Sequence, residues 1–235
     1  MGAIPDEAWR IEPLLDVQRP PDQRFRGGAL PLPLSRRYGT DVTIALRPER
    51  PTIVANFVST LDGVVAFDAL GRSGGREVSG GFAPDRFLMG LLRATADVVL
   101  VGAGTVRSRS RHVWTPGHAH PPSTAAFATW RRQLGLPAPQ PTTVVVTASG
   151  RIDPEHPGLH DPNVPVLLLA TASGFLTIAP QIAGRAAALP RLALVEGLGY
   201  EIGATPWAEL RSVMRAGSHL FLRYGLTEPP RHTGE

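Results

Sequence analysis

The chain has 235 residues, of which 43% are hydrophobic and 19% are charged, a balance typical of a folded protein with a core rather than a disordered chain. The formal net charge is +4 and all 24 basic residues are arginine, which favours an anionic small ligand over nucleic acid and excludes a Schiff-base lysine mechanism. There is no cysteine, so disulfides, thiol nucleophiles and cysteine-bound zinc are excluded.

The chain has neither an N-terminal signal pattern nor an apolar run of membrane-spanning length, so we expect a cytoplasmic protein that does not enter a membrane. Residues 1–40 are rich in Pro, Arg and Asp, and we expect an N-terminal arm with a short helix around Glu7 to Leu15. The apolar run Thr52–Val58 predicts a first strand. The Asp62-Gly63 pair after it indicates either a tight turn or a place where Ser59 and Asp62 meet a ligand.

A flexible loop is expected over Gly71–Gly81, with Ser79 placed either to meet a phosphate at the start of the next helix or only to form a turn. Helical spacing of apolar residues from Pro84 to Thr95 predicts that helix. Arg93, near its end, could fork onto a substrate phosphate or lie solvated at the helix end.

A continuous apolar run, Val98–Val101, predicts a strand buried on both faces, as in α/β sheets. Gly102, Gly104 and Thr105 follow at its carboxyl end, where ligands of open α/β sheets bind. Glycine there lets the backbone approach a ligand without a Cβ in the way. We therefore expect these three residues to line the principal ligand site.

The basic loop Arg107–Arg111 could clamp a dinucleotide 2′-phosphate or be solvated. Three histidines follow, but they lie in a Pro- and Gly-rich loop without nearby carboxylates, so we expect surface side chains and no metal site. They are His112, His118 and His120.

Later patterns predict a short helix over Phe127–Leu134 and a C-terminal hairpin over Arg211–Gly225 that turns at Ala216-Gly217. Further strands are expected at Thr142–Thr147, Val166–Ala170, Phe175–Ala179 and Leu192–Val195. Buried strands with few helices between them indicate a mixed sheet rather than a strict βαβ array.

Several segments together resemble the reductase domain of bacterial riboflavin biosynthesis, the C-terminal half of the bifunctional deaminase-reductase. The resemblance covers most of residues 50–225 and rests on VANFVSTLDGVVA, LLRATADVVLVGAGTV, VVVTASG, FLTIAPQIAGR, and LVEG with RAGSHLFLRY. It implies an α/β, dihydrofolate reductase-like three-layer domain with a mixed, mostly parallel central sheet and a C-terminal antiparallel hairpin. The expected boundaries are an arm over 1–40, a reductase-like domain over 41–226 and a disordered tail over 227–235.

The resemblance also implies a homodimer that uses NADPH to deliver hydride to the C1′ imine carbon of an opened pyrimidine ribosylamino 5′-phosphate. By motif, Phe57, Gly102, Gly104, Thr105 and Ser149 would meet the cofactor. Ser79 and Arg93 would hold the substrate, and Asp62, the candidate catalytic residue, would support the turn after the first strand. The zinc deaminase half needs cysteine ligands, so that activity is not expected here.

Two departures from the family pattern leave a second reading open. Arg109 stands where the family usually has Asp, and Phe175 follows Gly174 where a few tens of family residues, including a Glu-Gly-Gly-Pro turn, are expected. Glu196-Gly197 imitates that turn, but Leu198 replaces its second glycine. The alternative to an active reductase is a degenerate family member that acts as a binding or structural subunit. A Rossmann dehydrogenase, based on Gly102 and Gly104 alone, ranks last.

Overall fold

The computed structural model of the chain describes residues 9–16, 24–46, 51–65, 75–108, 111–182, 207–216 and 219–227. The chain divides into two compact units, one made of Met1–Thr52 with Gly197–Glu235 and the other of Ile53–Glu196. The predicted arm over 1–40, domain over 41–226 and tail over 227–235 stay predictions, and the predicted strand Leu192–Val195 lies outside the described residues.

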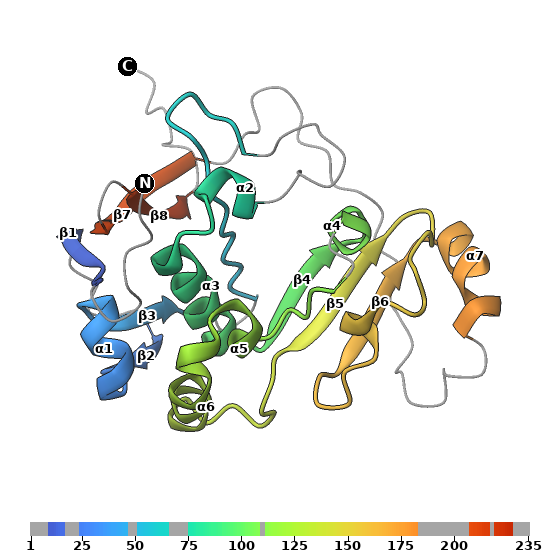
Figure 1. Cartoon of the computed structure of the whole chain (residues 1–235), viewed down its shortest axis with the longest axis horizontal. Helices are drawn as coiled ribbons and strands as arrows, with labels where there is room; N and C mark the ends of the chain where they lie inside the picture. The colour runs from blue at the N-terminus through green and yellow to red at the C-terminus, as the bar shows by residue number, and fades with distance from the viewer. Residues whose placement is uncertain are drawn as a thin grey trace, which may run out of the picture. The chain divides into compact units, whose positions relative to one another are not determined.

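The unit Ile53–Glu196 is built around a parallel sheet of β4 (Val98–Gly102), β5 (Thr142–Thr147) and β6 (Val166–Ala170), in that order (Figure 1). Its helices are α2 (Gly75–Ser79), α3 (Ala83–Thr95), α4 (Ala103–Ser108), α5 (Pro116–Ala119), α6 (Thr124–Gln133) and α7 (Ala172–Ile182), with 3-10 turns η1 (Pro121–Ser123) and η2 (Pro157–Leu159). Three predicted strands and two predicted helices are thereby confirmed. The strands pair in parallel, with Gly102 opposite Val146 and Thr147 opposite Ala170, so their carboxyl ends share one edge.

One face of this sheet forms the core of the unit. Its buried cluster consists of Val101, Ala103, Val106, Trp114, Val145, Ile152, Val164, Val166, Leu168 and Ile178. Alternate residues point the other way, and on that face Val98 is 46% exposed and Leu100 is 59% exposed. The prediction that Val98–Val101 is buried on both faces is therefore wrong, because only alternate side chains of β4 reach the core.

Helices α3, α5 and α6 pack together beside the amino end of β4, forming a second apolar cluster (Figure 1). Phe87, Leu91 and Phe127 are fully buried there. Thr95 joins the helices, because its hydroxyl donates to the Leu91 carbonyl at 2.9 Å and accepts from Trp130 Nε1 at 3.0 Å.

The predicted strand Phe175–Ala179 is wrong, because these residues lie inside α7. Thr171 caps this helix, since its Oγ1 accepts from the Gly174 amide at 3.1 Å. Gly174 and Ile178, one helical turn apart, are buried, whereas Phe175 is 48% exposed. The chain therefore passes from β6 directly into a helix at Gly174-Phe175, and not into a second strand.

The predicted strand Thr52–Val58 is also wrong, since no residue from 51 to 65 belongs to a strand. Ile53 is 75% exposed and Phe57 is 74% exposed, so the β preference of this run is not supported by a pairing partner. The tight turn expected at Asp62-Gly63 is present. The Gly63 amide donates to the Thr60 carbonyl at 3.0 Å, and the Thr60 amide donates to the Val64 carbonyl at 3.0 Å.

The other unit contains the hairpin predicted over Arg211–Gly225, formed by β7 (Trp207–Ala216) and β8 (His219–Thr227). Strand β1 (Glu12–Asp16) pairs antiparallel with β7, and Arg215 Nη2 contacts Glu12 Oε2 at 2.8 Å. The helix expected around Glu7 to Leu15 is therefore wrong from Glu12 onward, because this segment completes a sheet. The unit also contains β2 (Phe25–Gly28), α1 (Leu32–Tyr38) and β3 (Val42–Ala45).

The α/β class expected from the sequence is confirmed, with a parallel sheet and an antiparallel hairpin both present, consistent with a dihydrofolate reductase-like fold. Among the described residues, the hairpin pairs with β1 in a sheet separate from β4, β5 and β6. No helix in the described part of the chain is both long and apolar enough to cross a membrane.

Candidate functional site

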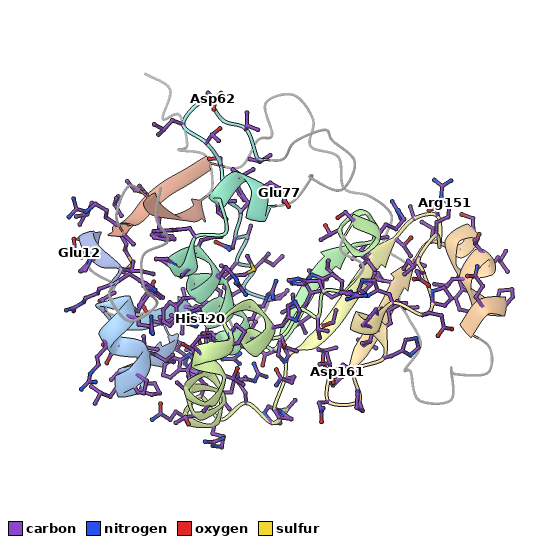
Figure 2. All side chains as sticks on the ribbon, in the orientation of Figure 1. Glu12, Asp62, Glu77, His120, Arg151 and Asp161 are labelled. Carbon is purple, nitrogen blue, oxygen red and sulfur yellow. The ribbon has the colours of Figure 1, made fainter. Side chains whose placement is uncertain are left out.

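The carboxyl edge of the parallel sheet brings three short loops together. The chain leaves β4 at Gly102 into α4, leaves β5 at Thr147 into Ala148–Gly150, and leaves β6 at Ala170 into α7. In Figure 2 the labelled Arg151 lies beyond this edge, and the labelled Asp161 lies toward the opposite end of the strands. The three loops follow from parallel pairing, which places like ends of the strands side by side.

Two glycines fix how closely the β5 and β6 loops approach. A Cβ on Gly150 would lie 2.0 Å from the Gly174 carbonyl oxygen, and Gly150 has a φ of +67°. Thr171 ties the loops further, because its hydroxyl donates to the Ala148 carbonyl at 2.5 Å. No larger residue fits at Gly150 without moving the backbone, so this part of the edge has a defined shape.

The predicted cofactor residues on β4 and β5 meet at this edge and are accessible. Gly102, Gly104, Thr105 and Ser149 are all exposed. A Cβ on Gly102 would meet nothing within 4 Å, so open space lies over the backbone there. A guanidinium also belongs to this edge, since Arg107 Nη1 donates to the Arg151 carbonyl at 2.8 Å.

These groups fit a phosphorylated dinucleotide. Open glycine backbone allows close approach, the Thr105 and Ser149 hydroxyls can donate to phosphate oxygens, and the Arg107 guanidinium supplies positive charge. Ser149 also orders its own loop, since its Oγ accepts from the Arg151 amide at 3.4 Å. Binding and orienting an anionic ligand is the chemistry that this edge can perform.

Arg93 lies elsewhere, in the last turn of α3, which precedes the amino end of β4. Its Nη1 donates to the Thr115 carbonyl at 3.3 Å, and its Nη1 and Nη2 lie 3.4 and 3.5 Å from His112 Nε2. Burial lowers the pKa of Arg93 from its usual value to about 10. Neutral partners do not offset this desolvation, so the guanidinium is suited to an incoming anion.

The three histidines differ in environment, and the expectation that all lie on the surface is wrong for His120. That ring is buried, its Nδ1 lies 2.9 Å from Ser123 Oγ, and it packs edge-on against Phe87. The short 3-10 turn η1 brings Ser123 back to it. His112 is half-buried and His118 is exposed, and their rings lie 4.3 Å apart edge to face.

The remaining predicted site residues are not brought to the sheet edge by any described contact. Ser79 ends α2, and its buried Oγ has no hydrogen-bond partner among the described residues. Asp62 accepts from the Thr60 hydroxyl, which also accepts from the Val64 amide at 3.0 Å, so Asp62 supports the turn. Phe57 lies exposed on the preceding segment. The ligand roles of these three residues stay predictions.

Two other kinds of site are a metal centre and a surface hollow. In the described ranges no group of three or more His, Asp or Glu side chains could hold a metal ion. The other unit has a shallow hollow that contains none of the predicted residues and is lined by Arg10, Ser35, Arg36, Gly39, Thr40 and Asp41.

Sequence reasoning missed two groups of residues. Thr171 and Ser173 add hydroxyls to the third loop, and the preference of helix N-caps for Thr and Ser could have identified them. Arg86 and Gly90 were also missed, and their helical spacing from the predicted Arg93 could have placed both guanidinium groups on one face of α3.

The comparisons with known proteins agree with this architecture. The family model of the RibD C-terminal domain matches residues 51–196, which is more than half of the chain. That domain is the reductase part of the riboflavin biosynthesis deaminase-reductase, of the dihydrofolate reductase-like kind and typically dependent on a nicotinamide cofactor. No curated protein matches the chain.

Proposed function

Because the chain belongs to the RibD C-terminal domain family, we propose that it is an NADPH-dependent reductase of a pyrimidine ribosylamino 5′-phosphate or of a closely related small molecule. The single observation that carries this proposal is the carboxyl edge of β4 and β5, where Gly102, Gly104, Thr105 and Ser149 gather in open space. Such edges are where α/β sheets bind nucleotides.

In this proposal the cofactor supplies hydride to the C1′ imine carbon of the opened sugar, and the protein supplies binding and orientation. Gly102 and Gly104 admit the cofactor to the backbone, and the hydroxyls of Thr105 and Ser149 hold its polar groups. Arg107 offers a charge to a cofactor phosphate. Phe57 is assigned to the nicotinamide side of the site, and Asp62 keeps the adjacent turn in place.

Arg93 is assigned to the substrate 5′-phosphate, and Ser79 is assigned to the substrate as well. Support for Arg93 comes from its neutral partners, the Thr115 carbonyl and His112, which leave its charge without compensation. A phosphate would receive forked hydrogen bonds from a guanidinium that is already desolvated.

The first experiment titrates the purified chain with NADPH and with NADH, and binding is detected by nicotinamide fluorescence. The second measures turnover of the pyrimidine phosphate as the loss of nicotinamide absorbance. We expect NADPH to bind more tightly than NADH. Arg93→Ala should weaken the substrate more than the cofactor, whereas Arg132→Ala, an exposed arginine of α6, should change neither. Equal loss of both ligands in the Arg93 variant would contradict the assignment.

A degenerate, inactive member of the family is the second candidate. It is favoured by the end of the family match at Glu196, after which Gly197-Leu198 stands in place of the family Gly-Gly-Pro. NADPH binding without turnover of the pyrimidine phosphate would favour this candidate over the reductase.

We also propose a homodimer in the cytoplasm. β4 is an edge strand of its sheet among the described residues, and its exposed Val98 and Leu100 need cover. Light scattering at micromolar concentration should give twice the mass of the chain. A clean monomer would contradict the dimer and leave the reductase proposal standing.

A further inference from the structure

A cluster of basic groups forms where α5 packs on α3. Arg86, Gly90 and Arg93 share one face of α3. A Cβ on Gly90 would lie 3.0 Å from the Pro116 carbonyl oxygen, so glycine allows the backbone of α5 to come close. Arg86 Nε donates to the Ala119 carbonyl at 3.0 Å, while Arg93 donates to the Thr115 carbonyl. The two guanidinium groups thus bind the backbone at opposite ends of α5, at Thr115 and Ala119. His118 lies between these two contact points in the sequence.

The charges of both arginines act on the His118 ring. Partial burial and the positive charges of Arg93 and Arg86 lower the pKa of His118 from its usual value. The ring is nevertheless exposed, so a ligand from solvent can reach it. The backbone amide of His118 donates to Thr115 Oγ1 at 3.2 Å, and this hydrogen bond holds the first turn of α5 in place.

His112 completes the cluster from the loop before α5. An arginine has only donors, so the contact of Arg93 with His112 Nε2 requires that nitrogen to accept, and His112 is then neutral with its proton on Nδ1. A bound anion would place negative charge beside His118 and favour the protonated form of that ring.

Other charged and titratable groups belong to the elements that pack around α5. On α3, Asp85 is buried in the first turn, and Arg111 lies in the loop before α5. On α5 and η1, His120 is engaged with Ser123, and η2 contributes His156, which stacks on Trp114. Among the described residues neither Arg86 nor Arg93 forms an ion pair with a carboxylate.

We propose that Arg86, Arg93, His112 and His118 form a proton-linked site for a phosphate monoester, in which binding of the dianion is coupled to proton uptake by His118. This inference rests on the proposed function in one respect, the assignment of Arg93 to the substrate phosphate, and adds that protonation of His118 sets how tightly that phosphate binds at each pH. A nearby opposite charge moves a pKa by about one unit or more, so a dianion should bind about tenfold more tightly once His118 is protonated.

Sulfate is the probe, because it remains a dianion throughout the range used and any pH dependence then belongs to the protein. Calorimetric titration of the whole chain should give about tenfold tighter sulfate binding at pH 5.5 than at pH 7.5. Repeating it in two buffers of different ionisation enthalpy should show proton uptake on binding. The His118 imidazole NMR signal should titrate at a higher pH when sulfate is saturating.

His118→Gln should bind sulfate with little dependence on pH. His160→Gln is the matched control, because this exposed ring bonds the Pro154 carbonyl and is not one of the four residues of the proposed site, so the variant should behave as the parent chain does. A one-dimensional NMR spectrum of each variant establishes that it is folded.

Three outcomes overturn the inference, and they separate it from the proposed function. Sulfate binding that does not depend on pH in the parent chain removes the proton linkage but keeps Arg93 as a phosphate residue. An unchanged slope in His118→Gln shows that another group takes up the proton. Absence of sulfate binding at pH 5.5 removes the anion site together with the substrate role of Arg93, whereas NADPH binding is measured separately and can still stand.

Discussion

Arg131 is the residue whose replacement should most clearly destabilise the helical part of the unit Ile53–Glu196. It is 3% exposed, and its Nη1 donates to the Ala96 carbonyl at 2.7 Å and the Ala94 carbonyl at 3.2 Å. From the other side of the same guanidinium, Nε and Nη2 donate to the Ala138 carbonyl at 3.2 and 3.0 Å. One side chain of α6 thus satisfies the carboxyl end of α3 and the loop that leads into β5.

Arg131→Met keeps the apolar stem but leaves these carbonyls without their donor. A hydrogen bond to a charged group contributes about 1.5–3 kcal/mol, so loss of the Ala96 and Ala138 contacts should cost at least about 3 kcal/mol. For a chain of this size that corresponds to a fall in Tm of about 6–12 °C. The Tm of Arg131→Lys should lie between those of the parent and of Arg131→Met, because an ammonium cannot reach both sides as the planar guanidinium does.

The assay is a thermal melt followed by circular dichroism, with urea unfolding to give the free energy. Arg132→Met is the matched control, since its Nη2 contacts only the exposed Thr129 hydroxyl at 3.0 Å, and its Tm should stay within about 2 °C of the parent. If Arg131→Met also melts within that interval, the carbonyls are satisfied without the guanidinium and the reasoning fails.

Two further substitutions test the packing around α3. Gly90→Ala should lower the Tm by several degrees, because the new Cβ would lie 2.7 Å from Phe127 Cε2, whereas Gly104→Ala, with only Arg107 Nη2 at 3.9 Å, should keep or raise the Tm. Equal melting of the two alanine variants would show that α3 and α6 adjust without cost. Thr95→Val should cost about 1–3 kcal/mol in urea unfolding, because Trp130 Nε1 loses its acceptor. Thr129→Val, on the exposed face of α6, serves as control and should stay within about 0.5 kcal/mol.

The parallel sheet could be predicted because its signal is local. Thr142–Thr147 and Val166–Ala170 are short β-rich runs between turn residues, and both form strands. Phe175–Ala179 is also a short apolar run but lies in a helix. Thr171 caps this helix, and its buried positions recur at helical rather than strand spacing. Short apolar runs do not distinguish the two, and the cap decides.

The site could be predicted where it depends on strand direction. Gly102, Thr105 and Ser149 follow strands that run in parallel, so they meet at one edge whatever the details of packing. Arg93 could be proposed as an anion-binding residue, but its place in the fold could not be predicted, because it depends on how α5 packs against Gly90. The basic cluster with His118 is a product of that tertiary contact, and no single stretch of the sequence contains it.

The lowered pKa of His118 has a consequence for stability that does not depend on activity. In the unfolded chain the ring takes up a proton near its ordinary pKa of 6.5, whereas in the folded chain burial and the two arginines oppose protonation. The unfolded state therefore binds more protons, and the contribution of His118 to stability is lost progressively as pH falls below about 6.5 through the folded value. A bound dianion opposes this loss, because it raises the pKa of the folded ring. Thermal melts with and without saturating sulfate should show a sulfate-induced rise in Tm that is larger at pH 5.5 than at pH 7.5, since ligand that binds only the folded state stabilises it by mass action. Carboxylates titrate mainly at lower pH, so they affect this interval less. In His118→Gln the rise should be similar at both values of pH, and a rise in the parent chain that shrinks toward pH 5.5 would show that sulfate does not meet a protonated His118.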